Sequence, residues 1–112
     1  MKITVAQESG AALIQISGSV DSLTSDEAQT FFDEQIKNNQ VRLVVDLSQV
    51  DYLSSAGLRV LLSALKSARQ RGGDLYFAGL QDNVRKVLDL AGFTSIFKIF
   101  PTVEEAVGAF AI

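Results

Sequence analysis

The sequence predicts an α/β fold in which a mixed, mainly parallel five-strand sheet is combined with about four helices. Two observations carry this prediction. Apolar residues repeat every second residue in some segments and every three to four residues in others, and the two patterns alternate along the chain. Most successive strands are also separated by a predicted helix, which is the kind of connection that parallel neighbours require.

In the first third of the chain, the sequence predicts two strands followed by a helix. Ile3–Val5 and Leu13–Ser17 have the composition and alternation of strands. A capping box is predicted at the start of the helix, with the Thr24 hydroxyl accepting from the backbone N–H of Glu27 while the Glu27 side chain reaches back. We expect this helix to run to about Lys37.

The middle of the chain predicts a buried strand followed by an amphipathic helix. Arg42–Leu47 is a dense run of branched apolar residues, typical of a central strand that is covered on both faces. Gly72 and Gly73 are expected to end the helix that follows. The apolar face of that helix comprises Leu58, Leu61, Leu62, Leu65 and Ala68.

The last third predicts two further strands and two further helices. Asp74–Ala78 is expected to be a strand, and the segment from Val84 to Ala91 a helix that stops at Gly92. Ile96–Phe100 is a short final strand. A second capping box at Thr102–Glu105 opens the final helix.

Composition limits the possible functions. The 112 residues fit a single domain, 1–112. The chain has no cysteine and no histidine, so we expect no thiol or histidine catalysis, no metal site and no cofactor. With a net charge of −3 and no basic cluster, nucleic-acid binding is not expected. No apolar stretch approaches the roughly 18 residues of a membrane span, which predicts a cytoplasmic protein without membrane insertion.

Two adjacent serines mark the connection between the buried strand and the amphipathic helix. In open α/β sheets, partners and ligands bind at the carboxyl ends of the strands, where this connection lies. Ser54 is well placed to be the N-cap of the helix, and capping alone explains its presence. Ser55 would then be the first helical residue, with its hydroxyl facing solvent. One cap does not require two serines, so Ser55 becomes the candidate functional residue.

Several segments together resemble the STAS domains, specifically the bacterial anti-sigma factor antagonists. Each segment alone is unspecific, but their order and spacing along nearly the whole chain resemble this family. The segments are Gly18–Asp21, Val44–Ser48, Tyr52–Leu58, Arg71–Leu75 and Leu90–Phe93.

The resemblance implies a binding protein, not an enzyme. In the family pattern, the unphosphorylated antagonist binds an anti-sigma factor that is also a serine kinase, and this frees the sigma factor. The kinase then phosphorylates the antagonist, the complex separates, and a serine phosphatase resets the switch. The acceptor lies two residues before the motif glycine, Gly57, and is therefore Ser55. Well-studied members have Asp where this chain has Ser54, which makes Ser54 the second choice of acceptor.

Partner binding is expected at Asp21, Ser54, Ser55, Gly57 and Arg59. Asp21 matches the family's acidic position near the acceptor. It either contacts the partner or positions the acceptor, or it is a turn residue before a helix. Arg59 lies four residues after Ser55, one helical turn away, where it either meets the phosphate or belongs to an ordinary solvated helix face.

Three other functions compete with this one. A serine hydrolase is disfavoured because there is no histidine and no GxSxG turn. A nucleotide-binding module is disfavoured because no glycine-rich phosphate loop is present. STAS domains also serve as regulatory subunits of lipid-transport or other signalling assemblies, and the sequence alone leaves that alternative open.

Overall fold

The computed structural model describes residues 1–111, so the predicted boundary at residue 112 lies outside it. A five-stranded sheet in the order β1-β2-β3-β4-β5 forms its centre. The strands are β1 (Lys2–Glu8), β2 (Ala11–Val20), β3 (Arg42–Leu53), β4 (Asp74–Ala78) and β5 (Lys98–Phe100). The helices are α1 (Ser25–Lys37), α2 (Ser55–Gln70), α3 (Asp82–Leu90) and α4 (Val103–Phe110), and a short 3₁₀ turn spans Phe93–Ser95.

The sheet is mixed and mainly parallel, as the sequence predicted. β1 and β2 form an antiparallel hairpin whose two-residue turn places Ser9 and Gly10 at φ 49° and 88°. Positive φ at both positions matches the turns that join tightly paired strands. β2, β3, β4 and β5 then run parallel to one another. A helix lies in each connection between them, which satisfies the length that a parallel crossover needs.

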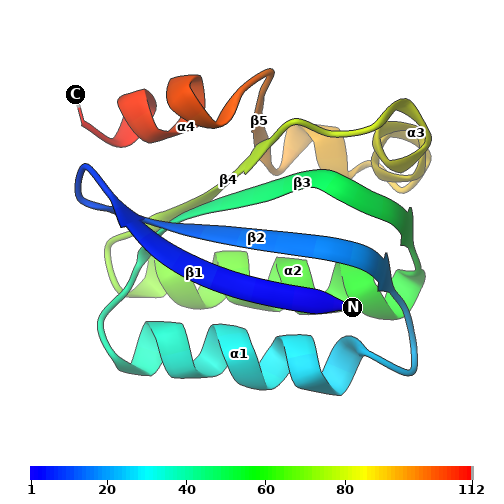
Figure 1. The fold of residues 1–112 in the computed structure, drawn as a ribbon, viewed down its shortest axis with the longest axis horizontal. Helices are drawn as coiled ribbons and strands as arrows, with labels where there is room; N and C mark the ends of the chain where they lie inside the picture. The colour runs from blue at the N-terminus through cyan, green and yellow to red at the C-terminus, as the bar shows by residue number, and fades with distance from the viewer. Residues whose placement is uncertain (112) are drawn as a thin grey trace.

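Helices cover both faces of the sheet, and each covered face has its own core. α1 and α2 lie under the sheet in Figure 1, and α4 lies over it. The larger core joins α1 and α2 to the sheet and includes Phe32, Leu61 and Phe77. The smaller core lies beneath α4, where the rings of Tyr76 and Phe110 stack with centroids 4.0 Å apart. β3 contributes to both cores and is the middle strand of the sheet, which confirms the predicted central strand.

Four of the five strands differ in extent from the predictions. β1 and β2 are longer at both ends than the predicted Ile3–Val5 and Leu13–Ser17, and β3 and β5 also have different bounds. β3 continues to Leu53, because its last residues keep pairing with β2 up to the pair Val20 and Leu53. Two register shifts interrupt this pairing, so the buried residues at this end of β3, Leu47, Val50 and Leu53, recur every third residue. Such irregularities hide the period of two by which a strand is recognised. β5 is also shorter than predicted, because the backbone N–H groups of Ile96 and Phe97 donate to the carbonyl of Phe93 in the preceding 3₁₀ turn.

The first predicted capping box is wrong and half of the second is confirmed. No side chain caps α1 at Thr24. Instead the Thr24 hydroxyl accepts from the Asp21 N–H at 3.0 Å and lies 3.1 Å from the Ser19 carbonyl oxygen, so it stabilises the preceding turn. In α4, the Thr102 hydroxyl accepts from the Glu105 N–H at 3.2 Å, as predicted.

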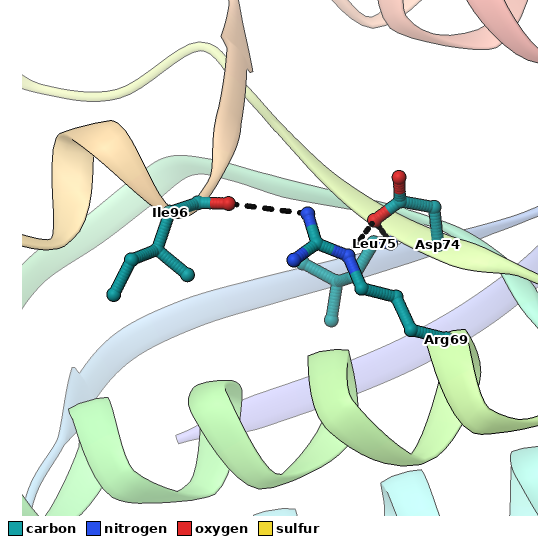
Figure 2. Close-up of polar contacts among 4 residues, drawn as sticks. All are labelled: Arg69, Asp74, Leu75 and Ile96. Atoms are coloured by element: carbon teal, nitrogen blue, oxygen red, sulfur yellow. Dashed lines mark hydrogen bonds and ion pairs between the residues drawn. The ribbon is translucent and has the colours of Figure 1, made fainter.

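Arg69 ties the C-terminal end of α2 to the sheet. Its Nε donates to Asp74 Oδ1 at 3.1 Å, and its Nη2 donates to the carbonyl of Ile96 at 3.2 Å (Figure 2). The same Asp74 oxygen accepts from the Leu75 N–H at 2.8 Å. Among residues 1–111 this is the only ion pair. Because the Arg69 side chain is 44% exposed, we expect the pair to contribute less than about 1 kcal/mol and mainly to orient the helix end.

Candidate functional site

A single residue, Ser54, joins the end of β3 to the start of α2. Its backbone N–H donates to the carbonyl of Val20 at 2.9 Å, so the end of β2 lies directly beside it. Val20 is followed by the turn that leads into α1. The two connections β2–α1 and β3–α2 therefore meet at the carboxyl ends of neighbouring parallel strands, where the sequence placed the site.

Ser54 is the N-cap of α2, as predicted. Its backbone is extended, with φ −86° and ψ 172°, and its side-chain oxygen accepts from the Gly57 N–H at 3.2 Å. Its carbonyl accepts the first helical bond, from the Leu58 N–H at 2.9 Å. Capping thus occupies the Ser54 hydroxyl, which is also only partly exposed.

Ser55 is the first residue of α2 and is exposed, as predicted. Within residues 1–111, its hydroxyl has no hydrogen-bond partner. The first turn of α2 contains no acidic residue, so the positive end of the helix dipole is not already compensated there. The site therefore offers an accessible alcohol at a place where added negative charge is favourable for the helix.

Gly57 is buried where α2 passes close to β2. A Cβ atom at this position would lie 2.7 Å from the Val20 carbonyl oxygen and 2.8 Å from Leu53 Cδ1. Both distances are too short for a Cβ atom, and because the Val20 oxygen belongs to the backbone, relief of that contact requires the helix or the strand to move. The structure thus explains why this position of the motif is a glycine. Gly57 lets the first turn of α2 lie against the end of β2, and this contact fixes the position of Ser55.

Asp21 holds the turn between β2 and α1. Its Oδ1 accepts from the backbone N–H of Leu23 at 2.9 Å and of Thr24 at 3.2 Å. An aspartate that bonds to the backbone two residues on is a standard way to fix a turn. Its predicted turn role is therefore present, and its contact with a partner stays a prediction.

Arg59 is exposed on the surface of α2. It forms no ion pair or side-chain hydrogen bond within the part of the chain that the structure describes. In the unphosphorylated domain Arg59 lies on a solvated helix face, and its contact with a phosphate on Ser55 stays a prediction.

Two exposed apolar side chains near this site were not singled out from the sequence. Leu23 is 92% exposed on the turn that Asp21 holds, and Tyr52 is 53% exposed near the end of β3. Tyr52 pairs with Ser19 near the end of β2, and Leu23 lies in the turn that follows this strand. The two apolar residues are therefore at the same end of the sheet. A leucine inside an otherwise polar turn segment, Asp21–Ser25, was the available signal for Leu23.

The STAS domain family matches residues 2–106 of the chain. The chain belongs to this family. None of the helices within residues 1–111 is long and apolar enough to cross a bilayer. In the same residues, no three acidic side chains gather as ligands for a metal ion.

Two curated relatives match this STAS domain over nearly its whole length. It is 36% identical over 110 residues to BtrV of Bordetella bronchiseptica, named as a candidate anti-sigma factor antagonist, covering 98% of this chain and 95% of that protein. It is 30% identical over 110 residues to the anti-sigma F factor antagonist of Paenibacillus polymyxa, covering 97% and 92%.

Two solved structures show the same fold. An anti-sigma factor antagonist from Mycobacterium paratuberculosis superimposes with a TM-score of 0.88 at 24% identity, covering 96% of this chain and 92% of the other. The phosphorylated form of SpoIIAA, a cell fate determinant of Bacillus, superimposes with a TM-score of 0.75 at 14% identity, covering 97% and 99%.

The two serines of the STAS domain are expected to differ in their effect on stability. Ser54→Ala removes the acceptor for the Gly57 N–H and should lower the free energy of unfolding by about 1 kcal/mol. Ser55→Ala removes an exposed hydroxyl without a partner and should change it by less than about 0.5 kcal/mol. Urea denaturation of both variants measures the difference, and an equal loss for Ser55→Ala would show that Ser55 also has a structural role.

Proposed function

We propose that this STAS domain is an anti-sigma factor antagonist whose binding is switched by phosphorylation of Ser55. Relatives that carry this name match it over nearly the whole chain. The observation that carries the proposal is the exposed Ser55 hydroxyl at the start of α2, beside the turn that Asp21 holds. In this proposal the domain is a binding protein of the cytoplasm, with no catalytic residue of its own.

In the proposed cycle, the unphosphorylated domain binds an anti-sigma factor that is also a serine kinase, and the sigma factor is released. The Ser55 hydroxyl oxygen then attacks the γ-phosphorus of ATP. The bond from that phosphorus to the leaving ADP oxygen breaks, and the serine proton passes to a base of the kinase. A separate serine phosphatase hydrolyses the phosphoserine and restores the hydroxyl.

A phosphate on Ser55 suits the folded domain and not the complex. It adds about −1.5 to −2 charge. At the exposed start of α2, where no acidic residue opposes it, this charge should stabilise the helix by roughly 0.3–1 kcal/mol. Arg59, one turn further on, is available to contact it. In a partner interface the same charge loses its water, and without matching cations it costs several kcal/mol.

We assign partner binding to a docking face made of Asp21, Leu23, Tyr52, Ser55 and Arg59. Leu23 and Tyr52 supply exposed apolar surface, and interfaces concentrate their binding energy in such side chains when a partner covers them. Ser54 and Gly57, which the sequence also assigned to partner binding, act in this proposal through the geometry of the loop. Ser54 caps α2, and Gly57 lets it approach β2.

Phosphosite mapping tests the assignment of the acceptor. After incubation with the cognate kinase and ATP, and equally in protein isolated from its own cells, we expect mass spectrometry to find one phosphate, on Ser55. Ser55→Ala should abolish the phosphorylation. Ser54→Ala is the matched control and should retain it. Phosphate that persists in Ser55→Ala and disappears in Ser54→Ala would move the acceptor to Ser54, and phosphate on neither serine would contradict the proposed switch.

A further inference from the structure

β1 leaves one edge of the sheet open. It is the outer strand, drawn in dark blue at the front of Figure 1. Residues 4–8 are exposed, and all seven residues of β1 pair with β2 without a register shift. The other side of this regular strand therefore presents backbone N–H and C=O groups that a further strand can pair with.

The opposite edge of the sheet is protected in the usual ways. β5 has only three residues, begins with Lys98 and is followed directly by Pro101. Short length, charge and proline all disfavour pairing at an edge. β1 is longer and contains neither proline nor a bulge. The two edges thus differ, and only β1 is suited to extend the sheet.

The residue pattern of β1 is complementary to itself. Its only charged residues are Lys2 and Glu8, one at each end. When two β1 strands pair antiparallel about Val5, Lys2 of each lies opposite Glu8 of the other. Opposite charges in directly facing positions stabilise a strand pair, and like charges destabilise it. A shift of two residues in either direction loses both charge pairs, so this register is favoured over its neighbours.

The side chains of β1 also lie on suitable faces for this pairing. Lys2 and Glu8 pair with Ser17 and Ala11 of β2, so both charges lie on one face of the sheet. Val5 pairs with Ile14 and lies on the other face, towards the larger core. Its side chain is 39% exposed, and a second Val5 directly opposite would cover part of that apolar surface.

We propose that two copies of this chain associate through β1, by antiparallel pairing centred on Val5 that joins their sheets into one. The interface is isologous, because each strand contributes the same residues to both halves. It uses no residue of the docking face, because none of the five residues of that face lies in β1. The association therefore does not depend on the proposed function of Ser55.

Charge reversal tests the pairing and its register. Lys2→Glu or Glu8→Lys alone replaces two attractive pairs in the dimer by two repulsive ones and should weaken association by about tenfold. The double variant Lys2→Glu/Glu8→Lys restores opposite charges and should return to within about twofold of the wild type. Neither residue has a charged partner on β2, so the changes should leave the monomer fold intact. Sedimentation equilibrium measures the dissociation constants.

Disulfide trapping locates the contact, because the chain has no native cysteine. Facing residues of paired strands have Cβ atoms about 4.5–5.5 Å apart, close to the reach of a disulfide. Val5→Cys should therefore form a cross-linked dimer under mild oxidation. Gln7→Cys is the matched control: it lies on the same face of β1, but its counterpart would be about 13 Å away along the strand. It should remain uncross-linked.

Dimer formation by the wild type, recovery in the double variant and selective trapping at position 5 would support the proposal. A wild-type chain that stays monomeric at millimolar concentration would overturn it. Equal trapping at positions 5 and 7, or a double variant as weak as the single ones, would overturn the register and with it the pairing. The effect of Ser55 variants on partner binding does not test the dimer, and the dimer experiments do not test the role of Ser55. Each proposal can therefore be contradicted without the other.

Discussion

Replacement of Ser55 by glutamate is expected to weaken binding of the cognate anti-sigma factor by about a hundredfold or more. The new carboxylate would lose its water in the docked complex, and an unpaired buried charge costs about 3–5 kcal/mol. Since each 1.4 kcal/mol is a factor of ten in affinity, even a partly hydrated carboxylate gives about a hundredfold loss. Ser55→Ala should bind as tightly as the unphosphorylated wild type and should no longer be released by the kinase with ATP. Titration calorimetry with the purified partner measures both affinities.

Two controls test whether the loss of affinity comes from a charge at position 55, from the size of the new side chain or from the change in net charge. Ser55→Gln has nearly the shape of Ser55→Glu without the charge and should lose much less affinity. Thr30→Glu adds the same charge at an exposed position in the middle of α1 and should bind like the wild type. Equal affinity for the wild type and Ser55→Glu would contradict the switch. An equally large loss in Thr30→Glu would mean that net charge, and not the docking face, controls binding.

Gly57→Ala is expected to lower the free energy of unfolding by about 1–3 kcal/mol. Two effects oppose each other at this position. Alanine is a better helix former than glycine by roughly 0.5–1 kcal/mol, which favours the substitution. The added Cβ, however, would lie 2.7 Å from the Val20 carbonyl oxygen and 2.9 Å from Val20 Cγ1. Because one of these atoms is backbone, relief requires α2 to move away from β2, and overpacking of this kind outweighs the gain in propensity.

The chain contains its own control for this experiment. Gly108 also lies within a helix, α4, but a Cβ atom there would meet no heavy atom within 4 Å. Gly108→Ala should therefore raise the free energy of unfolding by roughly 0.5–1 kcal/mol. Urea unfolding of both variants under one set of conditions gives the comparison. Stabilisation by Gly57→Ala equal to that by Gly108→Ala would show that α2 does not need its close contact with β2.

Displacement of α2 in Gly57→Ala should also reach the docking face. Ser55 lies two residues before Gly57, and the Ser54 cap bonds directly to the Gly57 N–H. A shift of this turn changes the position of Ser55 relative to Leu23 on the neighbouring turn. We therefore expect weaker partner binding by Gly57→Ala at temperatures where it is fully folded, with Gly108→Ala unchanged.

The sequence by itself determined the features that depend on neighbouring residues. Ser54 as the cap of α2, Ser55 as its first residue and the Thr102 cap of α4 follow from local hydrogen-bonding chemistry, which a short segment contains completely. The five strands and four helices follow from apolar periodicity. The helices between the strands also allowed the parallel arrangement to be predicted.

Only the tertiary structure decided the features that depend on contacts between distant segments. The extension of β3 to Leu53 follows from its shifted pairing with β2. The need for Gly57 arises from its distance to Val20, thirty-seven residues earlier in the chain. A local pattern states what each segment favours, but the distance between two segments is fixed only when the sheet and its helices have packed together.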